Sequence, residues 1–256
     1  MIHARSVRLA AVIVLGGAVA LATSACGGPM QAGAASVVQG QRTTDATVQD
    51  QVASIVSLVQ HNNLQQGDIT DAQRGSLAKA QINLLVQQAV WQRVADDHGV
   101  AVTAADDAKE HSSLVQQARA SIQQAQASAG GSPFTGSDNE AVALADAESQ
   151  SSTGLAPSTV PIYTHIQALI TSVVSNTAGK LHVDPNDQNS LPALQAAILP
   201  MLSKAATEIN VKISPRYGSF DPATRQIVAA QASWIRPTAA QIAAAAAAQQ
   251  QQQPQQ

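Results

Sequence analysis

The chain has 256 residues, of which 45% are hydrophobic and 12% charged, and its formal net charge is −3. Removal of Arg5 and Arg8 with the first 25 residues would take that charge from −3 to −5, and such an acidic balance argues against a nucleic-acid partner. Aromatic residues make up only 2% of the chain, while alanine and glutamine are abundant, which favours helices around a core of small side chains.

The first 25 residues have the order of an export signal. Arg5 and Arg8 precede an apolar run over 9–22, and small residues then lead to Cys26. The run is shorter than the roughly 20 residues that a transmembrane helix needs. We therefore expect residues 1–25 to be a secretory signal peptide.

Cys26 is the only cysteine of the chain, so it cannot form an internal disulfide, and it follows the expected cleavage point. Ala25 and Cys26 resemble the lipobox of bacterial lipoproteins, with Thr23 where that family usually has leucine. The resemblance implies a diacylglycerol on the Cys26 thiol, and two acyl chains anchor a protein stably. Residues 26–34 would then be the lipidated N-terminus and a tether. An ordinary secretory signal with a chance cysteine is the alternative.

The first folded elements are expected directly after this tether. Residues 35–40 predict a short strand followed by a turn, and Thr44 is the predicted N-cap of a helix over 45–60. The apolar side chains of that helix recur at helical spacing and form one stripe. They are Val48, Val52, Ile55, Val56 and Val59.

The clearest helical pattern runs from about 70 to 98, where Gly99 is placed to end it. Thr103, with Asp106 three residues later, indicates a variant of the capping box at the start of a helix to about 129. Residues 130–133 then break the chain.

Three further helices are expected over 139–149, 158–176 and 190–208, the last kinked by Pro200. Residues 209–213 alternate between apolar and polar side chains, which predicts a strand. From residue 222 the chain is rich in Ala and Gln, and we expect a mostly disordered tail over 222–256. Whether its apolar pair Trp234 and Ile235 docks on the domain is left open.

The two predicted strands stand at opposite ends of the folded region. A lone strand leaves backbone hydrogen-bonding groups unpaired, so we expect residues 36–40 to pair with 209–214. The predicted fold is mainly α: one helical domain over 35–221, closed by a small two-stranded sheet that joins its first and last strands.

Several of these segments resemble the N-terminal domain of the SurA family and its PrsA and trigger-factor relatives. They are the strand at 35–40, the helix that ends in Gly99-Val100-Ala101-Val102-Thr103, and the closing strand followed by Ser214-Pro215-Arg216-Tyr217-Gly218. The likeness is sharpest over 77–106 and 209–221 and weak over 107–208. It implies a helical cradle that holds unfolded or partly folded exported polypeptides.

Full-length members of that family insert a parvulin prolyl isomerase domain before the closing strand. Residues 107–208 indicate helix and loop with almost no strand, so the resemblance carries over the chaperone part and not the isomerase. We therefore expect no enzyme activity and no cofactor.

The polar side chains offer little sign of a reactive centre. The six histidines show no pair at the i, i+4 spacing of a helical zinc motif, so no metal site is expected. The adjacent carboxylates Asp96–Asp97 and Asp106–Asp107 point to different sides of a helix, which favours solvated helix ends. Arg216 and Tyr217 favour a structural lock on the first strand or helix over a ligand site.

Trp91 is the one candidate for peptide binding. It either anchors client peptides from an exposed position or packs beside the apolar stripe of its helix. The expected function is that of a membrane-anchored, extracytoplasmic lipoprotein with chaperone-like binding of exported polypeptides. The alternative is an envelope scaffold or accessory lipoprotein for one specific partner. The sequence leaves the client, the oligomeric state and the arrangement of the helices in 107–208 open.

Overall fold

The computed structural model describes residues 32–62, 64, 68–129, 134–149 and 153–230. The expected signal peptide, Cys26, most of the tether, and the pair Trp234 and Ile235 lie outside these residues. The described helices are α1 (Asp45–His61), α2 (Asp71–Asp97), α3 (Ala104–Ala129), α4 (Asp138–Glu148), α5 (Val160–Leu181) and α6 (Leu191–Glu208). The strands are β1 (Ala34–Val38), β2 (Gln41–Thr44), β3 (Val211–Ile213), β4 (Ser219–Asp221) and β5 (Gln226–Val228).

The fold is mainly α, as expected, and its first strand pairs with the closing strand. β1 and β3 are antiparallel, with Ser36 opposite Ile213 and Val38 opposite Val211. The sheet nevertheless has three strands, in the order β2-β1-β3, where two were expected. The turn after β1 is a tight one in which Gln39 (φ 49°) and Gly40 (φ 80°) both adopt left-handed conformations, the geometry that favours a two-residue hairpin.

A second correction concerns the chain after residue 221, where a disordered tail was expected to begin. β4 pairs with β5 in a separate two-stranded sheet, with Phe220 opposite Ile227. Asp221 closes the turn, since its carboxylate accepts from the Ala223 amide at 3.0 Å and from the Thr224 hydroxyl at 2.8 Å. The folded region therefore extends through β5.

The helix starts follow the capping chemistry of the sequence. Thr44 accepts from the amide of Thr47 at 3.1 Å, and Thr103 and Asp106 form the expected reciprocal bonds. Thr70 and Ser137 make capping boxes at α2 and α4. α5 continues five residues beyond its expected end, to a left-handed cap at His182 (φ 56°).

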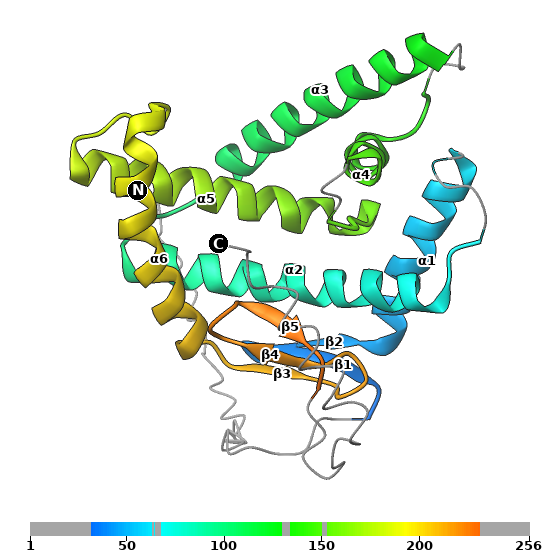
Figure 1. Cartoon of the computed structure of the whole chain (residues 1–256), viewed down its shortest axis with the longest axis horizontal. Coiled ribbons are helices and arrows are strands. Elements are labelled where there is room, and N and C mark those ends of the chain that lie inside the picture. The colour runs from blue at the N-terminus through cyan, green and yellow to red at the C-terminus, as the bar shows by residue number, and fades with distance from the viewer. Residues whose placement is uncertain (1–31, 63, 65–67, 130–133, 150–152, 231–256) are drawn as a thin grey trace, which may run out of the picture.

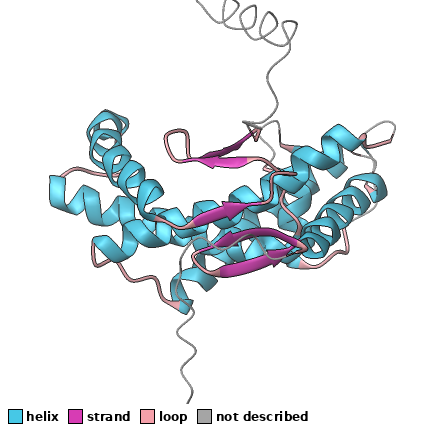
Figure 2. Cartoon of the chain, turned by 90° about the horizontal axis from the view of Figure 1, so that it is seen from below, coloured by secondary structure: helices cyan, strands magenta, loops and turns pink. Residues whose placement is uncertain are grey.

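α2 is the central element of the fold. Figure 1 shows it between the strands and α5, with α1 near one end, α6 near the other, and α3 and α4 beyond α5. The strands lie on the face seen from below in Figure 2. None of the helices in the described ranges combines the length and apolar character that crossing a bilayer requires.

Three groups of buried side chains hold these elements together. The first joins β1 and α2 to α5 and α6, with Val94, Leu169 and Leu202 among its members. The second lies between α2, α3, α4 and α5. The third packs α1 and the start of α2 against the sheet and Tyr217. Because α2 contributes to all three groups, it is the helix around which the core is organised.

Candidate functional site

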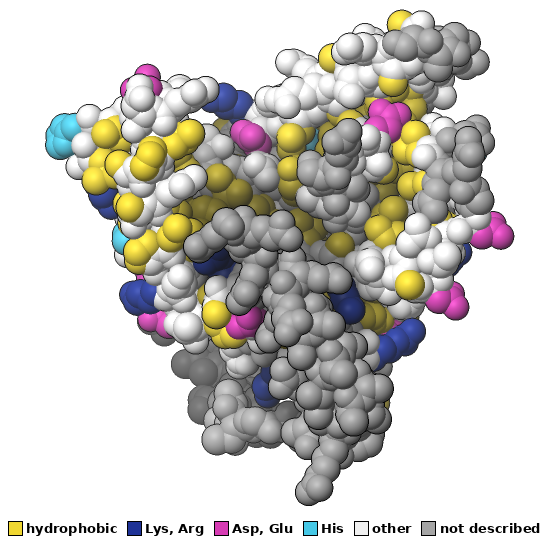
Figure 3. Space-filling model, in the orientation of Figure 1, with side chains coloured by type: hydrophobic (Ala, Val, Ile, Leu, Met, Phe, Trp, Pro, Cys, Tyr) yellow, Lys and Arg dark blue, Asp and Glu magenta, His cyan; other side chains and the backbone are white. Residues whose placement is uncertain are grey.

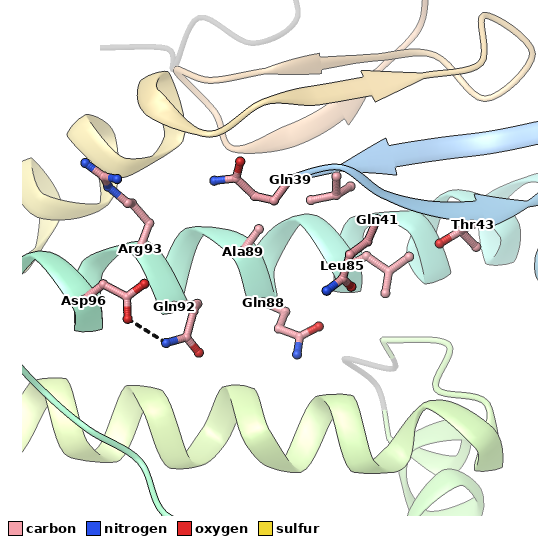
Figure 4. A pocket seen from close by; sticks show the side chains of 10 residues that line it. Gln39, Gln41, Thr43, Leu85, Gln88, Ala89, Gln92, Arg93 and Asp96 are labelled. Atoms are coloured by element: carbon pink, nitrogen blue, oxygen red, sulfur yellow. Dashed lines mark hydrogen bonds between the residues drawn. The ribbon is translucent and has the colours of Figure 1, made fainter. Parts of the chain in front are cut away.

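A groove of about 440 Å³ runs between the β1–β2 hairpin and α2 (Figure 4). The hairpin contributes one wall, and α2 residues between Leu85 and Asp96 contribute the other. Its lining residues are Val38, Gln39, Gln41, Thr43, Leu85, Gln88, Ala89, Gln92, Arg93 and Asp96.

The periodicity of each element places these side chains together. Gln41 and Thr43 are two residues apart on β2 and therefore share one side of the strand. The α2 residues between Leu85 and Asp96 recur at spacings of three and four, which puts them on one helix face. The groove therefore forms only where the β1–β2 hairpin lies against α2.

The groove combines an apolar floor with primary amides. Val38, Leu85 and Ala89 supply the apolar part. Gln41 and Gln88 make no side-chain hydrogen bond to any residue that the structure describes. A glutamine amide both donates and accepts, so these two side chains can satisfy either kind of backbone group of a ligand.

The other two glutamines of the groove are already engaged. The side-chain oxygen Oε1 of Gln39 accepts a hydrogen bond from the backbone N–H of Asn210 at 3.4 Å. Gln92 donates to Asp96 Oδ1 at 2.9 Å, and its Oε1 lies 3.2 Å from His165 Nε2. At this end of the groove Arg93 is also occupied, by Asp97 at 3.0 Å and Glu208 at 2.8 Å. Among the described residues, the groove glutamines whose side chains make no hydrogen bond are therefore Gln41 and Gln88.

Trp91 lies outside this groove. It is half-buried between the first and second core groups, and it lines a separate cavity of about 280 Å³ beside Leu202 and Arg225. Its indole thus has both a packing role and a face toward a cavity, and its part in peptide binding stays a prediction.

Two adjoining hollows lie around Tyr163 on α5. One of about 160 Å³ faces α2, the other of about 340 Å³ faces α3 and α4, and both are lined by Thr153, Leu155 and Tyr163. Burial raises the pKa of the Tyr163 phenol, and the nearby charges of Asp146 and Glu110 raise it further. Figure 3 shows hydrophobic side chains gathered on the face of the molecule that Figure 1 presents.

In the second carboxylate pair, Asp106–Asp107, one side chain departs from the expected solvated helix end. Asp106 does fill the capping box with Thr103, but Asp107 holds His165 of α5 at 2.9 Å. The contact joins residues 58 positions apart, which no local pattern indicates. Among the described residues no group of three or more metal-ligating side chains could hold an ion.

Arg216 and Tyr217 lie where a structural lock was expected. Arg216 forms an ion pair with Asp45 at 3.0 Å in the first turn of α1, and its guanidinium lies 5.5 Å from the centre of the Tyr217 ring. Tyr217 is 4% exposed. Both side chains thus hold the segment after β3 to the first turn of α1.

The groove glutamines were not singled out from the sequence. The available signals were the alternation of Gln39 and Gln41 around a tight turn and the four-residue spacing of Gln88 and Gln92. Both are weak, because exposed glutamines are common throughout this chain. Comparison with known proteins gave no matching family model, no matching curated protein and no matching solved structure.

Proposed function

We propose that this protein is a membrane-anchored, extracytoplasmic lipoprotein that binds extended segments of exported polypeptides in the manner of a chaperone. The observation that carries the binding role is the groove between the β1–β2 hairpin and α2, where the side chains of Gln41 and Gln88, which bond to no described residue, lie beside an apolar floor.

The chemistry of an unfolded segment fits this lining. Such a segment presents backbone N–H and C=O groups together with apolar side chains, and both need partners when removed from water. Glutamine amides serve the backbone groups without regard to sequence, while Val38, Leu85 and Ala89 offer contacts to apolar side chains. The family resemblance of 77–106 and 209–221 supports the same class of activity.

The anchoring part of the proposal rests on Cys26. A lipid on its thiol would hold the domain at the outer face of the membrane. Labelling cells with radioactive palmitate tests this: the protein should take up label, and the Cys26→Ala variant should not. Absence of label, or label that survives the substitution, contradicts the anchoring.

Aggregation of an unfolded client, measured with and without the purified protein, tests the binding part. The Gln41→Ala/Gln88→Ala double variant should suppress aggregation less well than the parent. The control is Gln60→Ala/Gln195→Ala, which changes two exposed glutamines outside the groove. No suppression by the parent at several-fold molar excess, or equal loss in both double variants, contradicts the proposal.

A scaffold or accessory role for one partner is the second candidate, and α6 favours it. Leu191 and Leu199 on this helix are 46% and 49% exposed, and residues 191–203 carry no charge. Exposed apolar surface of this kind marks interaction sites. Crosslinking in cells separates the candidates, since a chaperone captures many clients and an accessory protein one stoichiometric partner.

A further inference from the structure

His165 of α5 lies between side chains of two other helices. Its Nδ1 is 2.9 Å from Asp107 Oδ1 on α3, and its Nε2 is 3.2 Å from Gln92 Oε1 on α2. The Gln92 amide nitrogen in turn donates to Asp96 Oδ1 at 2.9 Å, the bond drawn in Figure 4. A single imidazole therefore connects α2, α3 and α5.

The acceptors in this series of contacts determine which ring nitrogens of His165 must carry a proton. A carboxylate only accepts, so the contact with Asp107 requires a proton on His165 Nδ1. The carboxylate of Asp96 takes the amide nitrogen of Gln92, which leaves the amide oxygen facing His165. This oxygen also only accepts, so the second contact requires a proton on Nε2. Both nitrogens carry protons only in the imidazolium form.

We propose that His165 is a protonation-dependent clasp of the three helices. In the imidazolium form it donates to both Asp107 and Gln92. When it loses a proton, the remaining N–H stays with the charged acceptor, Asp107, and the contact with Gln92 on α2 is lost.

The charged groups that face His165, directly or through Gln92, are both carboxylates. Asp107 faces the imidazole from α3, and Asp96 faces it through Gln92 from α2. No lysine or arginine in the described ranges pairs with either carboxylate, and Arg93, the neighbour of Gln92, is engaged by Asp97 and Glu208.

Further ionisable groups lie close in sequence to the members of the clasp. On α5, Tyr163 lies two residues before His165, and burial raises the pKa of its phenol. On α3, Asp106, Lys109, Glu110 and His111 lie within four residues of Asp107. His111 Nε2 is 3.0 Å from the neutral Asn139 on α4.

The clasp also regulates the groove, a step that rests on the proposed function whereas the clasp itself does not. Gln92 lines the groove, and its amide oxygen is occupied only while His165 is protonated. Loss of the proton frees that oxygen to accept from a bound polypeptide. Extended polypeptides should therefore bind more tightly at the alkaline end of the titration.

Thermal unfolding between pH 5 and 8 tests the clasp. Because only the imidazolium form donates to both Asp107 and Gln92, the stabilisation by the clasp should decrease as the pH rises from 5 to 8. Asp107→Asn keeps a hydrogen-bonding partner that also suits a neutral imidazole. The Tm advantage of the parent over this variant should shrink by about 2–4 °C across the range. A constant difference overturns the clasp.

His111→Gln is the matched control, because this histidine has a neutral partner and a single contact. A change of its Tm difference from the parent with pH that equals the change for Asp107→Asn would overturn the assignment to His165. NMR supplies a readout that does not depend on stability: the side-chain amide signals of Gln92 should move together with the titration of His165. If they do not move, the clasp is wrong.

Binding of a labelled, extended peptide to the purified protein at pH 5.5 and 8 tests the regulatory step. Tighter binding at pH 8 that disappears in Asp107→Asn supports it. Equal binding at both pH values overturns the regulation while leaving the proposed function intact. No binding at either pH, with the NMR result as expected, contradicts the proposed function and leaves the clasp standing.

Discussion

The hydroxyl of Tyr217 donates a hydrogen bond to the carboxylate of Asp45, which precedes it by 172 residues. The same hydroxyl accepts from Gln49 Nε2 at 3.0 Å, and Arg216 forms an ion pair with Asp45. These contacts fasten the end of the closing strand to the first turn of α1. Together with the β1–β3 pairing, these contacts join the first elements of the domain to the segment that follows its last helix. The helices α1 to α6 lie between these two joined segments in the sequence.

Tyr217→Phe should lower the free energy of unfolding by about 1–2 kcal/mol, because it removes a buried hydroxyl that bonds to Asp45 and Gln49. Urea unfolding at neutral pH measures this. Tyr163→Phe is the control: no hydrogen bond of the Tyr163 hydroxyl to a described residue is present, so the change should be within about 0.5 kcal/mol. Equal effects would show that the contacts of Tyr217 are not what stabilises the closure.

A pair of glycine substitutions should have opposite signs. Gly218 has φ 128°, and a Cβ built on it would lie 2.1 Å from the carbonyl oxygen of Val228. Gly218→Ala should therefore destabilise the protein and displace β5. Gly75 lies within α2 with nothing near its Cβ position, so Gly75→Ala should stabilise by about 0.5–1 kcal/mol. Chemical denaturation of both variants checks the two signs, and a destabilising Gly75→Ala would contradict the assignment of an unstrained helical position.

Acid should weaken the contact between α2 and α6. Asp97 lies 3.1 Å from Lys204, which lowers the pKa of the Asp97 carboxyl below 3.8, and the charge of Arg93 lowers it further. A depressed pKa contributes stability that is present above the unfolded-state value and is lost as the pH falls through the folded-state value.

The Tm of the parent should accordingly fall between pH 5 and pH 2, and Asp97→Asn should show a smaller fall. Asp50→Asn, an exposed carboxyl of α1, is the control and should keep the slope of the parent. Because the Asp97 pair is exposed to solvent, its effect should also shrink in high salt. Identical acid slopes in all three proteins would rule out a contribution from Asp97.

Filling the groove should weaken client binding without unfolding the protein. Ala89→Trp puts a large side chain on the apolar floor, so client binding should weaken at least tenfold, as measured by fluorescence anisotropy of a labelled extended peptide. Ala120→Trp adds the same bulk at an exposed position of α3 and should bind like the parent. Unchanged binding by Ala89→Trp would show that clients bind elsewhere, with the cavity beside Trp91 the next site to test.

The sequence by itself determined the elements whose signals are local. The capping residues Thr44 and Thr103 start α1 and α3 where expected, because a cap bonds to its own helix within three residues. The alternation at 209–213, with the need of backbone groups for partners, was sufficient to predict the β1–β3 pairing. β2, β4 and β5 were missed because each has only three or four residues, whereas the alternation that predicted β3 spans the five residues 209–213.

Only the tertiary structure decided which polar side chains meet. Gln41 and Gln88 belong to different elements, and the groove exists because the Gln39–Gly40 turn folds β2 back beside α2. Asp107 and His165 are 58 residues apart, and their contact depends on the packing of α3 against α5. The sequence determines which hydrogen bonds a side chain can make, but long-range packing determines its partner. The groove and the clasp could therefore be identified only from the tertiary structure.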